Sequence, residues 1–397
     1  MNDFAGSHYY RVNRILLTCL GLWPYYTQRT NYVYSTFLFL LLLSNVFFQL
    51  SSFIVKGYSV DRLLNIFSIL GITLYYTVKY FAMFTNSSKV RELMEQIRYD
   101  WNTLKEKEEF KIIRHRANIG RSCTIILLIW IYTTTFVFIL MLSSPSILDI
   151  AMPLNESRSL WQISVMVELF VNEEKYIGLL TFYLLLSGFI GISTMIAVET
   201  FVLMYVQHTC AMFQITSYRI ERIVNNSQMK WLISPEKFSI HKSLVETVDG
   251  HQNAIESIDS LKNTFSIAHF FAIPLSVSSL SINLYLLCER VMAGDIGGTS
   301  ILLLYVFSHF CYMLLCTYTG QLVIDHSDDI FKKICNTRWY EAPLSTQKCL
   351  MMITYRSMKT CTMMICLGLF VPSLPGFATL VSSSLSYFMV LYSVRRQ

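Results

Sequence analysis

Charge is scarce in this sequence. Lys, Arg, Asp and Glu together make up only 15% of its 397 residues, whereas apolar residues make up 53%. Soluble domains carry about 25% charged residues, because charge keeps a folded surface in water. Together with a mean hydropathy of +0.44, the scarcity of charge favours a membrane protein over a soluble globular one.

The sequence also lacks the short motifs of common enzymatic chemistry. It contains no GxxxxGK[ST] phosphate loop, no HExxH zinc motif, no GxSxG nucleophile turn and no GxGxxG dinucleotide turn. Ten cysteines are present, but no two of them have C-x-x-C spacing, so neither a zinc site nor a disulfide framework is indicated. We therefore expect a protein that is not an enzyme and that needs no cofactor or metal.

We expect no signal peptide within residues 1–30. Their only apolar piece, Ile15 to Trp23, is short, is followed by Pro24 and leads to no small-residue cleavage site. We expect the N-terminus to stay in the cytoplasm and a later apolar segment to insert first.

Seven apolar stretches are long enough to cross about 30 Å of hydrocarbon at 1.5 Å of rise per residue. We expect the fourth, sixth and last to tilt or to continue beyond the bilayer, because they are longer than one crossing needs. The sequence therefore predicts an all-α membrane protein with seven transmembrane helices. The stretches are 32–55, 62–84, 120–142, 177–206, 265–288, 299–324 and 361–394.

The distribution of Lys and Arg predicts the orientation. Alternate segments between the stretches sum to 23 basic residues on one side against 7 on the other, with Lys79 and Arg121 inside stretch ends. Because basic loops stay in the cytoplasm, the N-terminus is predicted inside and the C-terminus outside. Of the three N-x-S/T sequons, only Asn155 would then face outward and accept a glycan.

The cytoplasmic loops are predicted to be helical as well. Apolar residues recur at helical spacing between 90 and 104 with charges between them, which is typical of an amphipathic helix. Similar spacing at 208–224 and 244–264 predicts that spans four and five extend inward, with a break at Pro235. Such extensions pack either against other subunits or within one chain, and the spacing leaves both open. The apolar positions of the first helix are Val90, Leu93, Met94, Ile97, Trp101 and Leu104.

Few ionisable residues lie inside the predicted spans. Lys79, Arg121 and Glu199 lie near inner ends, where we expect their side chains to reach the interface. His326, in the run DHSDD, could suggest a cation site, but a solvated helix end is the favoured interpretation. Without a chain of carboxylates across the bilayer, a proton-coupled transporter is disfavoured.

The outer halves of several spans carry aromatic and weakly polar side chains instead. A cavity lined in this way would bind a small apolar molecule by burial, with a hydroxyl or imidazole group fixing its orientation. For any single residue, ordinary helix packing is the alternative. The candidate ligand-binding residues are Phe67, Leu70, Trp130, Tyr132, Thr135, Phe136, Tyr183, Leu186, Tyr305, Ser308 and His309.

The C-terminal third resembles the insect odorant receptor family. The resemblance is specific in GQLVIDHSDDIFKKICNTRWYEAPLSTQKCLMMITYRSMKTCTM (320–363) and SLPGFATLVSSSLSYFMVLYS (373–393). Its main features are Gly320-Gln321, Ser327, Trp339-Tyr340 with Pro343, Arg356-Ser357, Phe377 and Ser386-Tyr387. It is looser at RYDW (98–101), at QHTCAMF (207–213), and at His251 with AIESIDSLKNTF (254–265).

This resemblance implies an odorant-gated, non-selective cation channel subunit in the plasma membrane of an olfactory sensory neuron dendrite. Its implied partners are a small hydrophobic odorant, the lipid bilayer and a shared co-receptor in a heterotetramer, with no nucleic acid. Residues 1–324 would form six transmembrane helices with the odorant pocket, and 325–397 a cytoplasmic anchor helix followed by the pore helix.

The resemblance also assigns roles within the last helix. Val390 matches the family's hydrophobic gate, Ser393 a polar pore-lining position, and Ser386 also lies on the pore helix. A ring of apolar side chains blocks ions by dewetting, and slight widening rewets it. Pro375-Gly376 departs from the family pattern and predicts a kink before Phe377.

Two other receptor classes fit the sequence less well. A gustatory-type channel of the same superfamily usually ends in Gln-Phe, which is absent here. A G-protein-coupled receptor needs the opposite orientation, and neither its Asp-Arg-Tyr nor its Asn-Pro-x-x-Tyr motif is present in the expected place.

Overall fold

The computed structural model describes residues 6–26, 29–55, 59–151, 173–230, 234–363, 368 and 370–396. The predicted glycosylation site Asn155 lies outside these described residues. The chain forms η1 (Ser7–Tyr10), α1 (Arg11–Cys19), α2 (Arg29–Val55), α3 (Val60–Thr85), α4 (Ser87–Thr103), α5 (Lys107–Ala151), α6 (Glu173–Lys230), α7 (Ser234–Thr264), α8 (Ser266–Met292), α9 (Ile296–Asn336), η3 (Trp339–Glu341), α10 (Leu344–Ser357) and α11 (Leu374–Arg396).

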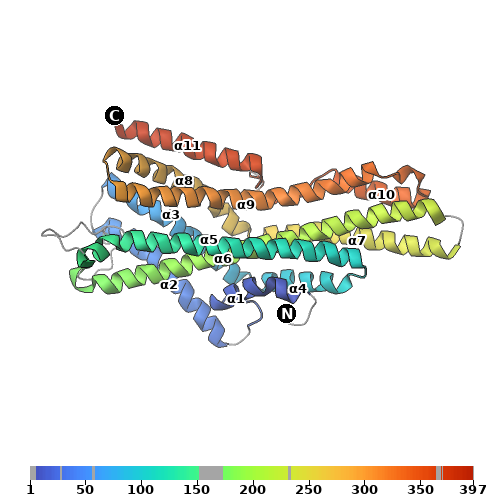
Figure 1. Cartoon of the computed structure of the whole chain (residues 1–397), viewed down its shortest axis with the longest axis horizontal. Helices are drawn as coiled ribbons and strands as arrows, with labels where there is room; N and C mark the ends of the chain where they lie inside the picture. The colour runs from blue at the N-terminus through green and yellow to red at the C-terminus, as the bar shows by residue number, and fades with distance from the viewer. Residues whose placement is uncertain are drawn as a thin grey trace.

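Seven of these helices are long and apolar enough to cross a membrane, counted over the described residues. Each coincides with a predicted stretch, which confirms the fold class: α2, α3, α5, α6, α8, α9 and α11. The helices form one elongated bundle (Figure 1). α11, α8 and α3 lie at one end, α5, α6 and α9 run along most of its length, and α7 and α10 lie at the other end.

The start of the last span was predicted too early. The stretch was expected to begin at residue 361, but α11 begins at Leu374. Pro375 then lies in the first turn of the helix, where a proline fits because that N–H has no partner within the helix. The predicted kink at Pro375-Gly376 is therefore wrong, because these residues start the helix rather than interrupt it.

The predicted amphipathic helix after the second span is confirmed as α4. It is separated from α3 by Asn86, and all six apolar positions predicted for it are buried. The indole nitrogen of Trp101 donates a hydrogen bond to the hydroxyl of Tyr10, 3.0 Å away, so the N-terminal segment packs on this helix. The inward extension of span four is confirmed too, since α6 is continuous over 58 residues.

The prediction that His326 lies at a solvated helix end is wrong. α9 continues to Asn336, and His326 is buried within the bundle. Its Nδ1 bonds the carbonyl oxygen of Leu322 at 2.8 Å, and its Nε2 is in close contact with Arg116 of α5. Among the described residues, no three His, Cys, Asp or Glu side chains are grouped to hold a metal ion.

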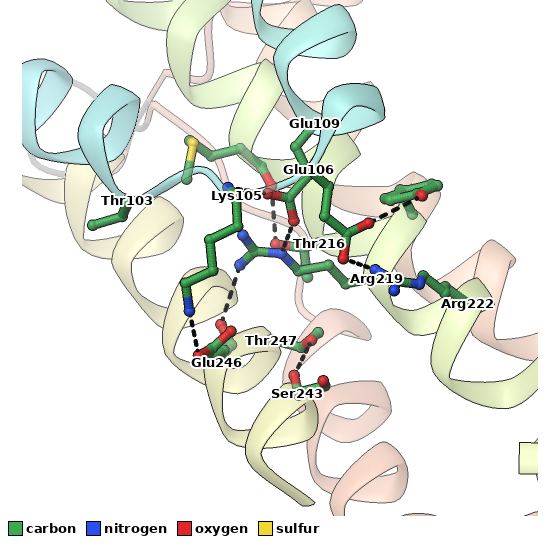
Figure 2. Close-up of polar contacts among 12 residues, drawn as sticks. Thr103, Lys105, Glu106, Glu109, Thr216, Arg219, Arg222, Ser243, Glu246 and Thr247 are labelled. Atoms are coloured by element: carbon green, nitrogen blue, oxygen red, sulfur yellow. Dashed lines mark hydrogen bonds and ion pairs between the residues drawn. The ribbon is translucent and has the colours of Figure 1, made fainter. Parts of the chain in front are cut away.

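A charged cluster ties the start of α5 to α6 and α7 (Figure 2), on the side of the bundle where α7 and α10 lie (Figure 1). Arg219 of α6 lies between the other two helices. Its Nε donates to Glu109 Oε1 at 2.5 Å, and one terminal nitrogen donates to the carbonyl oxygen of Glu246 at 3.4 Å. Glu109 is 3% exposed and also accepts from the backbone N–H of Lys105, 3.2 Å away. At the exposed rim, the Lys105 ammonium bonds Glu246 Oε1 at 2.7 Å and holds the pKa of that carboxyl below its ordinary value.

The two carboxylates of this cluster are expected to differ in their contribution to stability. Glu109→Gln leaves the partly buried Arg219 guanidinium without its anion, a change that destabilises by about 3 kcal/mol. Glu246→Gln, the matched control, breaks a solvent-exposed pair and changes the free energy of unfolding by about 0.5 kcal/mol. Thermal unfolding of the purified protein in detergent measures both. Equal melting temperatures for the two variants would contradict the assignment of Glu109 as a structural anion.

Candidate functional site

The start of α11 is positioned by α9, and the motif residues of the C-terminal third explain how. A Cβ atom on Gly320 would overlap Pro372, so only glycine lets the segment before α11 cross α9 this closely. Gln321 Oε1 accepts from the backbone N–H of Leu374, the first residue of α11, at 3.2 Å. Ser327 Oγ accepts from the backbone N–H of Cys361 at 3.0 Å. Gln321 thus satisfies an N–H at the start of α11 that has no partner within the helix.

One face of α11 packs and the opposite face stays open. The helix packs on α8 and α9, where Leu380 and Ser384 are buried. The open face carries short hydroxyl side chains and borders a shallow cavity of about 500 Å³. The residues that line this cavity are Ala378, Thr379, Ser382, Ser383, Ser386 and Tyr387.

The three predicted pore residues lie on this open face. Ser386, Val390 and Ser393 are all exposed in the single chain, Val390 with 57% of its surface. Their spacing of four and three residues places them on one side of the helix. Val390 is the apolar member between hydroxyl-bearing side chains.

The C-terminal end of α11 is anchored by Arg395 and Arg396. Arg395 forms an ion pair with Asp61 at the start of α3, and its Nε donates to the Tyr285 hydroxyl of α8 at 3.3 Å. The Arg396 guanidinium lies 4.5 Å from the centroid of the Tyr392 ring. These contacts join the end of α11 to two neighbouring helices.

Five of the candidate ligand residues fall into three groups between neighbouring helices. Tyr183 of α6 shares a 2.7 Å hydrogen bond with Ser44 of α2. Tyr132 of α5 stacks on Phe189 of α6, with ring centroids 5.7 Å apart, and its hydroxyl lies 3.0 Å from Ser193 Oγ. Both groups involve the N-terminal half of α6.

The third group joins α9 to α8 and α3. The Tyr305 hydroxyl lies 3.2 Å from Ser279 Oγ and donates to the carbonyl oxygen of Ser68 at 3.3 Å. His309 Nε2 lies 3.1 Å from the carbonyl oxygen of Ser276. Ser308, between them in sequence, is half-buried.

The remaining candidates divide by burial. Leu70 is buried, and Trp130 and Thr135 are half-buried, with the Thr135 hydroxyl donating to its own helix at Ile131. Phe67, Phe136 and Leu186 are exposed on the surface of the single chain. The structure thus keeps Tyr132, Tyr183, Tyr305 and His309 between helices and leaves these three apolar candidates exposed.

The prediction that Lys79 and Glu199 reach the interface is wrong, because they form a buried ion pair. Lys79 Nζ lies 2.9 Å from Glu199 Oε1, and Lys79 is 1% exposed. Glu199 Oε1 also accepts from the hydroxyls of Tyr75 and Tyr312, at 3.0 and 2.7 Å. Sequence reasoning missed these two tyrosines. The available signal was the pair of opposite charges inside two spans, because such residues normally find each other in the membrane interior.

The chain matches known proteins along most of its length. The sequence profile described as "7tm Odorant receptor" matches residues 59–385. Odorant receptor 22c of Drosophila melanogaster is 22% identical over 221 residues, which cover 53% of this chain and 52% of that protein. The chain therefore spans about half the length of this curated relative.

Two solved structures of the insect olfactory receptor OR5 from Machilis hrabei, one in complex with eugenol, have the same fold. Each gives a TM-score of 0.75 and covers 98% of both chains at 14% sequence identity. At that identity the likeness shows the fold alone, while the profile match covers most of the sequence. The chain is a multi-pass membrane protein that belongs to the 7tm odorant receptor family.

Proposed function

We propose that this chain is a subunit of an odorant-gated, non-selective cation channel. The observation that carries the proposal is the open face of α11. A helix side that faced only lipid would present apolar side chains, whereas this side presents Thr379, Ser382, Ser383, Ser386 and Ser393. Exposed hydroxyls on a membrane helix suit a water-filled path, and Val390 interrupts them as an apolar constriction would.

The ligand in this proposal is a small apolar molecule held among the spans. The polar groups of Tyr132, Tyr183, Tyr305 and His309 lie between helices, beside aromatic and aliphatic surface. Such a region binds mainly by burial, and a few polar groups fix the orientation. The related OR5 structure in complex with eugenol shows that the same fold holds a small aromatic molecule in that protein.

The proposed assembly is a heterotetramer with a shared co-receptor. α10 supports it, because this helix, outside the candidate spans, exposes a run of large apolar side chains that one chain leaves uncovered. Met351, Met352 and Tyr355 of α10 are 57%, 71% and 81% exposed, and Met358, the first residue after the helix, is 67% exposed. In the proposed orientation the N-terminus and α10 are cytoplasmic, the C-terminus is outside, and the anchor and pore helices of residues 325–397 follow the six ligand-binding spans.

Whole-cell current tests this proposal. We expect the full chain to give a fast inward current to a volatile compound when it is expressed with an insect co-receptor, with G-protein signalling blocked. Neither chain alone should give that response. A response through a second messenger without current, or silence to a broad volatile panel with confirmed surface expression, would contradict the channel assignment.

A further inference from the structure

One face of α5 is left open by the described part of the chain. The opposite face of its N-terminal part is buried at helical spacing, at Ile113, Ala117, Gly120 and Thr124. The open face carries polar side chains first and apolar ones further along the helix, and all of the polar ones are exposed except the half-buried Arg121. We call this polar section the α5 stripe; it consists of Lys111, Arg114, Asn118, Arg121 and Ser122.

The α5 stripe ends where the most apolar part of α5 begins. Ile126 and Ile129, one and two turns after Ser122, are each 64% exposed, which suits contact with lipid. A rise of 1.5 Å per residue places Arg121 at this boundary and Arg114 about 10 Å before it along the helix. In the proposed orientation, the stripe therefore spans the headgroup region of the cytoplasmic leaflet and the water next to it.

Most side chains of the α5 stripe have hydrogen-bond donors that the chain itself does not use. Among the residues that the structure describes, no hydrogen bond or ion pair is made by the side chains of Arg114, Asn118, Arg121 or Ser122. Arg114 lies over the Phe110 ring, 5.7 Å from its centroid, a contact that uses none of its donors for a hydrogen bond. Polar groups at a membrane boundary are satisfied by water or by lipid headgroups, whose phosphate oxygens accept hydrogen bonds.

The charge on this face of α5 is positive. Lys111 Nζ lies 3.5 Å from the carboxylate of Glu108, at the far end of the stripe from the membrane boundary. Glu109 is buried and paired with Arg219, and no Asp or Glu follows it on α5 before Asp149. The guanidinium groups of the stripe are therefore not neutralised by any acidic side chain of their own helix.

Arg116 belongs to a different side of α5. Its Nε donates to Gln214 Oε1 of α6 at 3.0 Å, and its guanidinium is in close contact with His326 of α9. The chain thus uses this arginine to join its helices, whereas it leaves Arg114 and Arg121 on the same helix available for an anion from outside.

A phosphorylated inositol phospholipid matches the positions of these donors. Its phosphodiester lies next to the acyl chains, at the level of Arg121 and Ser122, and the phosphates on its ring extend into water toward Arg114. A guanidinium can bind a phosphate through two parallel N–H bonds. Phosphatidylserine carries all its charges close to the phosphodiester, so it leaves Arg114 without a phosphate.

We propose that the α5 stripe binds a phosphorylated inositol phospholipid of the cytoplasmic leaflet. Basic residues beside a membrane helix on that side are the groups that recognise such lipids. The inference goes beyond the proposed function and takes from it only the orientation of the chain.

Lipid binding to the purified full chain in a neutral detergent tests this inference without requiring a current. The probes are dioctanoyl phosphatidylinositol bisphosphate, dioctanoyl phosphatidylserine, dioctanoyl phosphatidylcholine and inositol trisphosphate, which has no acyl chains. We expect the bisphosphate lipid to reach half-maximal thermal stabilisation at about one tenth of the concentration that phosphatidylserine needs. Phosphatidylcholine and inositol trisphosphate should give no stabilisation at that concentration.

The double variant Arg114→Gln/Arg121→Gln should raise the half-maximal concentration of the bisphosphate lipid at least about tenfold. Lys348→Gln/Lys359→Gln is the matched control, because it removes the same charge from exposed positions on α10 and just after it. That control should shift the concentration less than about twofold, since salt screens charges beyond about 8 Å. Both double variants change surface side chains, so the melting temperature without lipid should stay close to that of the wild-type chain.

Equal stabilisation by phosphatidylserine or phosphatidylcholine would overturn the inference, and so would stabilisation by inositol trisphosphate alone at the same concentration. Undiminished binding by Arg114→Gln/Arg121→Gln, or an equal loss in the control, would overturn it as well. Absence of lipid binding beside a normal odorant-evoked current would overturn this inference alone. Selective lipid binding by a chain that gives no current with a co-receptor would leave it standing and contradict only the channel assignment.

Discussion

Val390→Ser is expected to open the channel in the absence of odorant. Val390 is the apolar side chain between the hydroxyl-bearing Ser386 and Ser393 on the open face of α11, and it is 57% exposed in the single chain. In the proposed pore it forms part of an apolar constriction that holds no water. An ion would have to lose its hydration shell to pass, and this cost keeps the pore closed. A hydroxyl at this position stabilises the wetted state, and a stabilisation of about 1.4 kcal/mol would raise the open fraction about tenfold.

The measurement is the basal current of cells that express this chain with a co-receptor, normalised to surface protein. Val381→Ser is the matched control, because nine residues of helix place Val381 on the opposite side of α11, where it is half-buried. That variant should lose some packing and show no leak. Equal basal currents for Val390→Ser, Val381→Ser and the wild-type chain would place the constriction elsewhere on the helix.

The sequence predicted most of the fold because hydrophobic length and periodicity are local properties. Seven apolar stretches identified the seven spans, and the spacing of residues such as Leu93, Ile97 and Trp101 identified the buried face of α4. The same reasoning failed for Lys79, Glu199 and His326 for one shared reason. It judged the surroundings of each residue from its depth in one span, without the helices that pack around it.

In the structure other helices cover these three residues. Lys79, Glu199 and His326 are all buried where α3, α5, α6 and α9 pack against one another. Lys79 therefore pairs with Glu199 instead of reaching water, and His326 contacts Arg116. These pairings join positions more than one hundred residues apart. A single sequence does not show which residues of two distant helices lie side by side, so the pairings could not be predicted from it.

The candidate site was likewise predicted only in part. The resemblance placed Ser386, Val390 and Ser393 on the last helix, and the structure places all three on its open face. The polar candidates Tyr305 and His309 were found from their depth in a span, whereas Tyr75 and Tyr312 were missed because their role depends on a carboxylate from another helix. What the sequence alone could not supply was the set of partners.

Gly320→Ala is expected to abolish the odorant-evoked current, even though alanine is the better helix former. Replacing glycine by alanine within a helix stabilises it by about 1 kcal/mol when there is room for the methyl group. At Gly320 there is none, because a Cβ atom would overlap the backbone and ring of Pro372. The segment before α11 must then move away from α9, and Gln321 loses its hydrogen bond to the N–H of Leu374.

Because overpacking costs about 1–3 kcal/mol, we expect Gly320→Ala to lower the melting temperature as well as to displace the pore helix. Gly188→Ala is the matched control, since a Cβ atom there meets no other atom within 4 Å. That variant should keep its current and melt at the same temperature or higher. Current amplitude and thermal unfolding, measured on both variants at equal surface expression, separate the steric effect from helix propensity. A normal current from Gly320→Ala would show that α11 tolerates displacement at its start, and the close crossing of α9 would then not be what positions the pore helix.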